Sequence, residues 1–400
     1  MGKRIIINYK NVRNGLNFFL IFIFLLSRLN PFISEASAFF WLPLLYAILL
    51  LVIFLSFRIR SDAKFSLDYY ILWLFFCSIY AFLTKIWANN SNDVDYIAVT
   101  MLENLWVFLT IYLYVSNKQD FDYALHAYFL AVKINAVCYL LTFFLNENAE
   151  GRLGGEINAN TVGFIMAFSI WLIIFYRIDN QKKKIDIVSG LWIFLFLLNL
   201  ILSGSKKAII MLILLLLIRQ LLKNKNAAFV LVKYLLLIIA ILIFLRIIPF
   251  LYNSIGYRIW DMIEFFVSQN SQNDYSTFQR FEMIRIGIHF FLDKPILGYG
   301  INNYHILSYA YFQRSWFDTY SHCNYIETLV SGGIVFFALY YSIYFRYIKK
   351  GKNQSNNKLF IYPLIITLFI IEIGMVTYYT SYCQLLICLS ACYIKANSKR

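Results

Sequence analysis

Long apolar runs separated by short polar stretches make up most of the sequence. Each run is continuous over about 17–25 residues, the length at which a helix crosses a hydrocarbon layer about 30 Å thick. Membrane barrel strands would instead alternate in polarity. The pattern therefore predicts an all-α polytopic membrane protein with about twelve transmembrane helices. We place them at 15–34, 38–57, 67–86, 96–115, 123–145, 162–177, 187–203, 207–219, 228–248, 324–345, 359–375 and 378–394.

The polar stretches fall into two sets that differ in charge. One set carries most of the lysines and arginines, for example in Lys182–Lys184 and Lys349–Lys352. The positive-inside rule assigns this set, and with it both termini, to the cytoplasm. The other set is then extracytoplasmic and includes one large loop over residues 249–323. We expect 1–400 to form a single integral membrane domain, with short amphipathic helices in the large loop, the clearest over Ser276–Asp293.

Composition excludes a soluble protein. Of the 400 residues, 61% are hydrophobic and only 14% are charged, whereas soluble domains average about 25% charged residues. The net charge of +15 follows from the cytoplasmic ends, so we interpret it as a topology signal with some attraction to membrane lipids and predict no nucleic-acid partner. Cysteines show no metal-binding or pairing pattern, and we predict neither a metal site nor a disulfide.

Basic residues at extracytoplasmic helix ends depart from the positive-inside trend. Arg152 precedes the sixth span, Lys206 and Lys207 open the eighth, and Arg280 and Arg285 belong to the large-loop helix. A guanidinium matches phosphate oxygens two at a time, and a helix start adds free N–H groups. Together they predict an anionic ligand at the outer leaflet; snorkelling or carboxylate pairing is the alternative for each residue. Arg280 and Arg285 would diverge by about 140° on a regular helix.

One histidine lies at the outer start of the tenth span. His322 is followed by Asn324 and Glu327. Imidazole titrates near neutral pH and can remove a proton from a hydroxyl group. Glu327 would orient the ring only if the helix begins after Asn324. The alternative is an interfacial histidine satisfied by water or backbone.

Three acidic residues elsewhere need an interpretation. Asp93 and Asp95 have the spacing of a metal-binding Asp-x-Asp, but in a short Asn- and Asp-rich loop we interpret them as solvated polar residues. Glu372 and the basic Lys133 fall within predicted spans. Ionisable residues within spans are typical of transport pathways, so they keep a transporter hypothesis open.

Four blocks, in order, resemble the O-antigen polymerase and O-antigen ligase superfamily of bacterial envelope glycan enzymes. The resemblance covers roughly residues 150–345, and the preceding residues match only as generic spans. The blocks are Gly151-Arg-Leu-Gly-Gly-Glu-Ile-Asn-Ala-Asn-Thr-Val-Gly163, Leu202-Ser-Gly-Ser-Lys-Lys-Ala208, Arg280 through Pro295-Ile-Leu-Gly-Tyr-Gly300, and Ser321-His-Cys-Asn-Tyr-Ile-Glu-Thr-Leu-Val-Ser-Gly-Gly333.

The resemblance implies a glycan donor linked to undecaprenyl diphosphate and transfer on the outer face of the cytoplasmic (inner) membrane, with no metal or other cofactor. It implies that Arg152 and Arg280 hold the diphosphate, that Arg280 is catalytic, and that His322 acts as a base or orients the acceptor hydroxyl. We predict Lys206 and Arg285 as further diphosphate ligands, and Asn324 and Glu327 as residues that orient the acceptor. Lys206 departs from the superfamily pattern, which usually has arginine after Ser-Gly-Ser; lysine keeps the charge but loses the bidentate geometry.

Three functions fit these residues. The first is an O-antigen or capsule polymerase that moves a growing glycan onto a new lipid-linked repeat unit, working with a chain-length regulator and a flippase. The second is a ligase that moves the finished glycan to lipid A core or another acceptor. The third is a flippase or transporter for lipid-linked sugars, which would need charges near mid-membrane, whereas most candidate residues lie at the outer edge.

Overall fold

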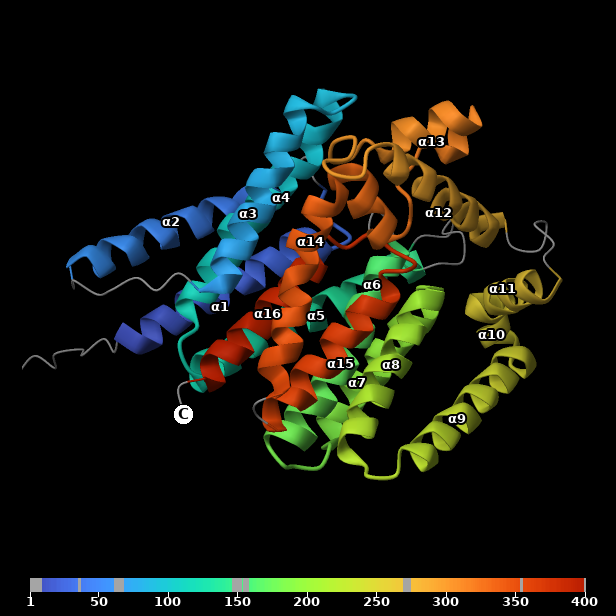
Figure 1. Ribbon diagram of the computed structural model, residues 1–400. Coiled ribbons are helices and arrows are strands. Elements are labelled where there is room, and N and C mark those ends of the chain that lie inside the picture. Colours follow the sequence, from blue (N-terminus) through green and yellow to red (C-terminus); the bar gives the residue numbers. More distant parts are fainter. Residues whose placement is uncertain are drawn as a thin grey trace, which may run out of the picture.

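The computed structural model describes residues 9–34, 37–60, 68–145, 153, 158–268, 275–352 and 355–398. Every regular element within these residues is a helix (Figure 1). The predicted all-α fold class is confirmed. Continuous apolar runs form helices because every backbone N–H and C=O must be paired inside a hydrocarbon layer.

Each predicted span corresponds to one helix. Several helices extend beyond the predicted apolar run, because a helix continues through polar residues after it has left the hydrocarbon; α5 begins at Lys118 and α14 ends at Lys352. The twelve helices are α1 (Tyr9–Leu29), α2 (Ala38–Arg60), α3 (Tyr69–Leu83), α4 (Ser91–Tyr114), α5 (Lys118–Leu145), α6 (Ala159–Ile174), α7 (Ile187–Leu202), α8 (Lys206–Lys223), α9 (Ala227–Ile247), α14 (Asn324–Lys352), α15 (Ser355–Ile371) and α16 (Ser381–Asn397).

By length and composition, eight helices of the described chain are long and apolar enough to cross a membrane. They are α1 to α6, α9 and α14, with the stretch after α6 included to Asn180. Ile187–Leu202 and Asn357–Ile371 are apolar but shorter. The predicted number of about twelve spans therefore includes helices that do not reach this length or composition, such as α8, which carries two lysines at its start and Arg219 and Lys223 near its end.

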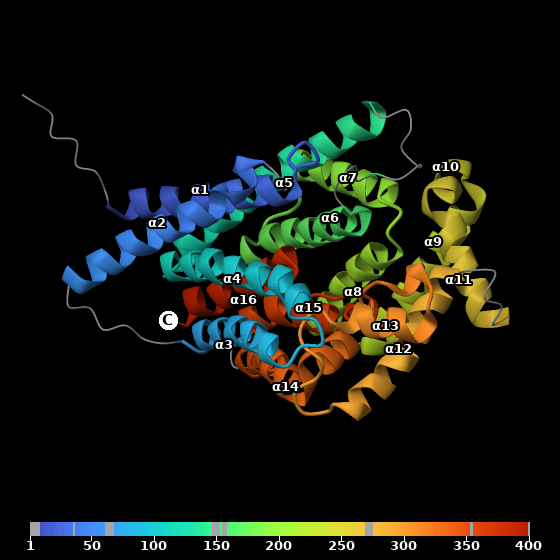
Figure 2. The same cartoon turned by 90° about the horizontal axis from the view of Figure 1, so that it is seen from above.

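The helices form one bundle around α6. This helix packs against α7 and α8, and its apolar stretch is 72% buried. The apolar stretch of α9 is only 11% buried, and both views place α9 at the edge of the bundle together with α10 (Pro249–Leu251) and α11 (Tyr257–Ser268) (Figure 2). Apolar side chains of α9 are therefore left for lipid.

The large loop folds into short helices over one end of the bundle. The predicted amphipathic helix is α12 (Tyr275–Asp293), and α13 (Tyr304–Phe312) follows it. Both pack on α14, close to the end at which α14 begins (Figure 1). Met283, Tyr304 and Val330 are buried in the small apolar core between these helices.

Glycine allows the turn after α12 to lie directly on α14. The backbone N–H groups of Tyr299 and Gly300 donate to the carbonyls of Val330 and Ser331 at 2.8 and 2.9 Å. At this point α14 is kinked at Gly333, whose φ is 63°, and a Cβ there would lie 2.1 Å from the Ile296 carbonyl oxygen. Only glycine combines a positive φ with so close an approach. The Pro-x-x-Gly-x-Gly block and the Gly-Gly pair thus form one joint.

Candidate functional site

His322 has a backbone conformation that residues other than glycine seldom adopt. Its φ is 57°, in the left-handed region, where such outliers are often found at functional sites. The residues on either side hold the turn. The Ser321 N–H donates to Glu327 Oε2 at 2.7 Å, and the Ser321 hydroxyl donates to the Cys323 carbonyl at 2.9 Å. Glu327 therefore fixes the backbone beside His322.

Asn324 joins the start of α14 to the turn after α15. Its backbone N–H donates to the Glu372 carbonyl at 2.8 Å. Its side-chain oxygen accepts the N–H groups of Thr377 and Tyr378 at 2.9 and 3.1 Å, and its amide donates to the Tyr341 hydroxyl at 2.8 Å. Asn324 is completely buried. The structure thus uses both polar ends of this side chain to set the position at which α14 begins.

The Glu372 carboxylate lies beside Asn324 and is surrounded by hydroxyl groups. Tyr341 and Tyr344 donate to its two oxygens at 2.8 and 2.5 Å, and Thr377 donates to it as well. Glu372 is fully buried. It follows the C-terminal end of α15 rather than lying in the middle of a span, which removes one of the two residues that had kept a transport pathway open.

His322 is half-buried and shares its surroundings with two cations from distant parts of the chain. Its ring lies 4.3 Å from that of Tyr320, between centroids. Burial, together with the positive charges of Arg280 and Lys207, lowers the pKa of His322 to about 3. Burial raises the pKa of the Tyr320 hydroxyl, and the charge of Arg280 opposes that rise. The fold therefore gathers α8, α12 and the turn before α14 at one place.

A cavity of about 1070 Å³ opens beside this group. Most of its polar lining comes from helix ends: the end of α1 and the starts of α2, α4, α6, α8 and α16. In an alternating bundle these ends share one side, which the charge pattern predicts to be extracytoplasmic. The polar and aromatic residues that line it next to the His322 turn are Asn158, Asn160, Lys207, Tyr320, Tyr379 and Tyr382.

Lys207, rather than Lys206, faces the cavity. Its amino group donates to the Gly374 carbonyl, whereas Lys206 is half-exposed and is not part of the lining. Adjacent helical residues point about 100° apart, so only packing could decide between the two lysines. The sequence alone predicts Lys207 only as a basic residue at an extracytoplasmic helix start, and it predicts the phosphate role for Lys206.

The Ser-Gly-Ser turn before these lysines is held from three sides. The Ser205 hydroxyl caps α8 by accepting the Ala208 N–H at 3.4 Å, and it donates to the Asn160 side-chain oxygen at 3.0 Å. Arg258 of α11 donates to the Gly204 carbonyl at 2.6 Å. The turn thus connects α6, α8 and the large loop. No sequence signal had marked Arg258 or Tyr320.

Of the other predicted cations, Arg285 does not join this group. Arg285 is exposed, and its guanidinium donates to Glu282 at 2.7 and 3.1 Å. This agrees with the expected divergence from Arg280 along α12. Arg152 lies outside the described residues, so its predicted role stays a prediction.

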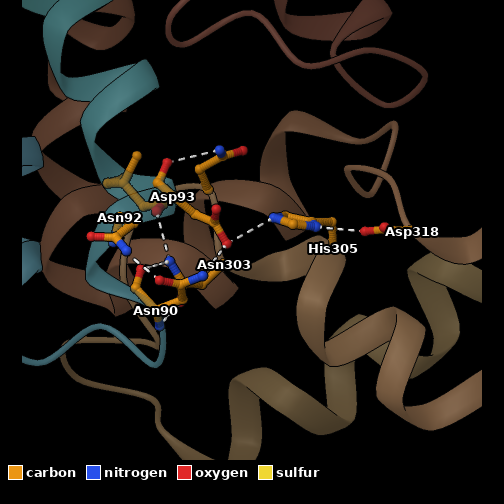
Figure 3. A network of polar contacts seen from close by, with 8 residues as sticks. Asn90, Asn92, Asp93, Asn303, His305 and Asp318 are labelled. Carbon is orange, nitrogen blue, oxygen red and sulfur yellow. Dashed lines mark hydrogen bonds and ion pairs between the residues drawn. The ribbon is translucent and has the colours of Figure 1, made fainter.

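A second histidine joins the large loop to the start of α4 (Figure 3). His305 Nδ1 lies 2.6 Å from Asp318 Oδ1, and its Nε2 lies 3.4 Å from Asp93 Oδ2. The Asn90 side chain donates to the same Asp93 oxygen at 2.9 Å. Asp93, interpreted from the sequence as a solvated residue, is instead part of a network that fastens the loop. Among the described residues, no group of three or more His, Cys, Asp or Glu side chains is placed to hold a metal.

The fold and the site together define a class: a helical membrane protein whose cavity combines polar, aromatic and cationic lining at one end of the bundle. Within it, residues 191–341 match the family model for O-antigen ligase, which confirms the predicted resemblance. The match begins in α7 and ends in α14, so it includes Lys207, Arg280 and His322 but not α1–α6. The family implies a glycosyltransferase-like enzyme acting on lipid-linked polysaccharide. No curated protein matches the sequence.

Proposed function

We propose that the protein is an O-antigen or capsule polymerase. It transfers a growing glycan from undecaprenyl diphosphate to a new lipid-linked repeat unit on the outer face of the bacterial cytoplasmic membrane. One observation carries the proposal: a histidine in a strained turn and the cations of α8 and α12 gather beside one large cavity. The same machinery would serve a ligase, and the family match does not distinguish the two functions.

Transfer needs a base for the acceptor hydroxyl and positive charge for the leaving diphosphate. His322 is neutral at ordinary pH because its pKa is lowered to about 3. A bound diphosphate would offset the positive charges of Arg280 and Lys207 and so raise that pKa, which makes the imidazole a stronger base for the hydroxyl proton. The acceptor oxygen bonds to the anomeric carbon of the donor, the bond from that carbon to the diphosphate oxygen breaks, and the hydroxyl proton passes to His322. Undecaprenyl diphosphate leaves with the electron pair of the broken bond.

The cations stabilise that departing group. Arg280 and Lys207 are close enough to His322 to act on its charge, and a bound diphosphate would lie between positive groups in a site with little water, where charge stabilisation is strongest. Arg152 keeps its predicted role as a further ligand. The exposed, paired position of Arg285 leaves it a contact at the outer surface rather than beside His322.

Substitutions at two residues test the proposal. We expect Arg280→Ala and His322→Ala each to abolish product while membrane abundance stays normal, because one removes charge stabilisation and the other the base. The assay uses purified protein, lipid-linked repeat units and a chelator, with glycan length measured on gels. His289→Ala is the matched control, because His289 is exposed on α12. Wild-type chain length in either variant would remove that residue from the site.

A deletion strain separates the two candidate functions. A single repeat left on the final acceptor indicates a polymerase, because the ligase still works on unpolymerised units. An acceptor with no glycan indicates a ligase.

Lys206→Arg should be tolerated in the same strain, and Lys207→Ala should lose more activity than Lys206→Ala, because Lys207 lines the cavity.

A further inference from the structure

A second group of polar and aromatic side chains lines the same cavity, on α1, α2 and α4. Arg28, at the end of α1, donates to Glu103 of α4 at 2.6 Å. The guanidinium carbon of Arg28 lies 3.4 Å from the centroid of the Phe40 ring and 6.0 Å from that of Trp41, both in the first turn of α2. All four residues belong to the cavity wall.

Helix packing alone gives little reason for this ion pair. The contact between α1 and α4 is already apolar, with Phe24 against Phe108 at 5.3 Å between centroids. Taking two charges out of water is often less favourable than packing apolar groups of the same volume. The side chains of Arg28 and Glu103 are only 14% and 9% exposed, and both line the cavity. Ionisable residues in such places generally mark a ligand pathway.

The combination of groups fits a sugar. A carboxylate accepts hydrogen bonds from hydroxyl groups, and a guanidinium donates to hydroxyl or ring oxygens. Trp41 is 41% exposed although it lines a cavity, which leaves apolar ring surface for the C–H face of a pyranose. A polyprenyl chain would gain nothing from a buried ion pair, because its carbons offer no polar partner.

We infer that Arg28, Glu103 and Trp41 form a glycan-binding subsite. The inference rests on the proposed function, and it adds where the sugar is recognised. The cavity that these residues line is also lined by Lys207 and Tyr320, next to His322. A glycan bound at the subsite therefore reaches the transfer site without leaving the cavity. The family match begins in α7, so this recognition belongs to a part of the chain outside the match.

The test compares three changes with a lipid-facing control. Trp41→Ala, Glu103→Gln and the charge-reversed double variant Arg28→Glu with Glu103→Arg are purified in detergent. Leu49→Ala is the control, because Leu49 lies on α2, is 54% exposed and does not line the cavity. Thermal unfolding reports on folding, and KM and kcat are measured with lipid-linked repeat units.

We expect KM to rise about tenfold or more in Trp41→Ala and Glu103→Gln. A tenfold rise corresponds to the loss of about 1.4 kcal/mol of binding free energy. The charge-reversed variant should recover the unfolding temperature of the wild type, because the ion pair is restored, but keep a raised KM. Recovery of both quantities would show an ion pair that only holds helices together. Unchanged KM in all three variants would also overturn the subsite.

Two further arms identify which glycan is bound. Long lipid-linked chains serve as donor and labelled repeat units as acceptor; a higher KM for one of them alone assigns the subsite to that substrate.

Binding of delipidated repeat-unit oligosaccharide is followed by thermal shift, with undecaprenyl diphosphate as the comparison. A wild-type protein that binds the oligosaccharide but transfers nothing would contradict the proposed function and leave the subsite standing. If the wild-type protein transfers glycan and the variants bind the oligosaccharide as tightly as the wild type does, the subsite is contradicted.

Discussion

At the scale of single residues, the site depends on side chains that hold one another in position. His322 has a positive φ, and Ser321, Glu327 and Asn324 stabilise the backbone around it. Such strain persists only where the surrounding contacts determine the conformation. Glu327, which would orient the imidazole only if the helix began after Asn324, contacts the backbone instead, because α14 begins at Asn324 and the carboxylate reaches back to Ser321. The ring is therefore positioned through the turn.

The lowered pKa of His322 predicts how stability changes with pH. The folded pKa is about 3, below the unfolded value of about 6.5, so the unfolded chain binds more protons between these values. The contribution of neutral His322 is present above about pH 6.5 and is lost as the pH falls toward 3. We expect the unfolding temperature in detergent to drop more between pH 7.5 and 5 in the wild type than in His322→Gln. Equal drops would mean that His322 is not buried beside cations.

At the scale of elements, small residues decide how closely the helices that carry the site approach. Gly163, the last residue of the first resemblance block, lies on α6 where it meets the turn between α7 and α8. A Cβ there would lie 2.7 Å from the Ser203 hydroxyl oxygen and 2.8 Å from the Ala208 Cβ. This contact holds the cavity-lining start of α6 against the turn that presents Lys207.

Gly163→Ala should therefore separate α6 from that turn and lower stability by about 1–3 kcal/mol, as overpacking generally does. Thermal unfolding in detergent measures the loss, and KM for lipid-linked repeat units should rise with it. Gly190→Ala is the matched control, because Gly190 lies in α7 with open space around the added methyl group. If both variants unfolded at the same temperature, the close approach of α6 and the turn would be wrong.

At the scale of the whole molecule, the arrangement of the helix ends determines what the cavity can reach. The large loop packs on the end of the bundle where α14 begins, and the cavity is lined by helix ends of that same side. A transfer reaction beside the cavity therefore uses substrate from one side of the membrane only. For a lipid-linked glycan to be that substrate, this side must be extracytoplasmic.

Reporter fusions test the orientation directly. Alkaline phosphatase is active only after export, so a fusion at Gln313, after α13, should be active and one at Lys225, between α8 and α9, should be inactive. A green fluorescent protein fused at the same positions should show the opposite pattern and serves as the control for expression. The reverse result would place the cavity on the cytoplasmic side and end the proposed polymerase and ligase functions together.

The sequence by itself determined the helices and the cations. Apolar runs fix where helices form because backbone pairing in lipid leaves no other choice, and so all twelve predicted runs became helices. The Pro-x-x-Gly-x-Gly and Gly-Gly blocks marked the joint on α14, since positive φ and close approach require glycine. Arg280 and His322 stood out because basic and titratable residues are rare at such positions in an apolar chain.

Only the tertiary structure decided which of these residues share a site. Lys207 and Lys206 are neighbours in sequence, yet packing of α8 places Lys207 in the cavity lining, whereas Lys206 is not part of it. Arg280 joins His322, and Arg285 faces away, because packing fixes the rotation of α12. The pairing of Arg28 with Glu103 joins residues far apart in the chain. Periodicity sets the direction of a side chain relative to its own helix, but its partners depend on how the helices pack together.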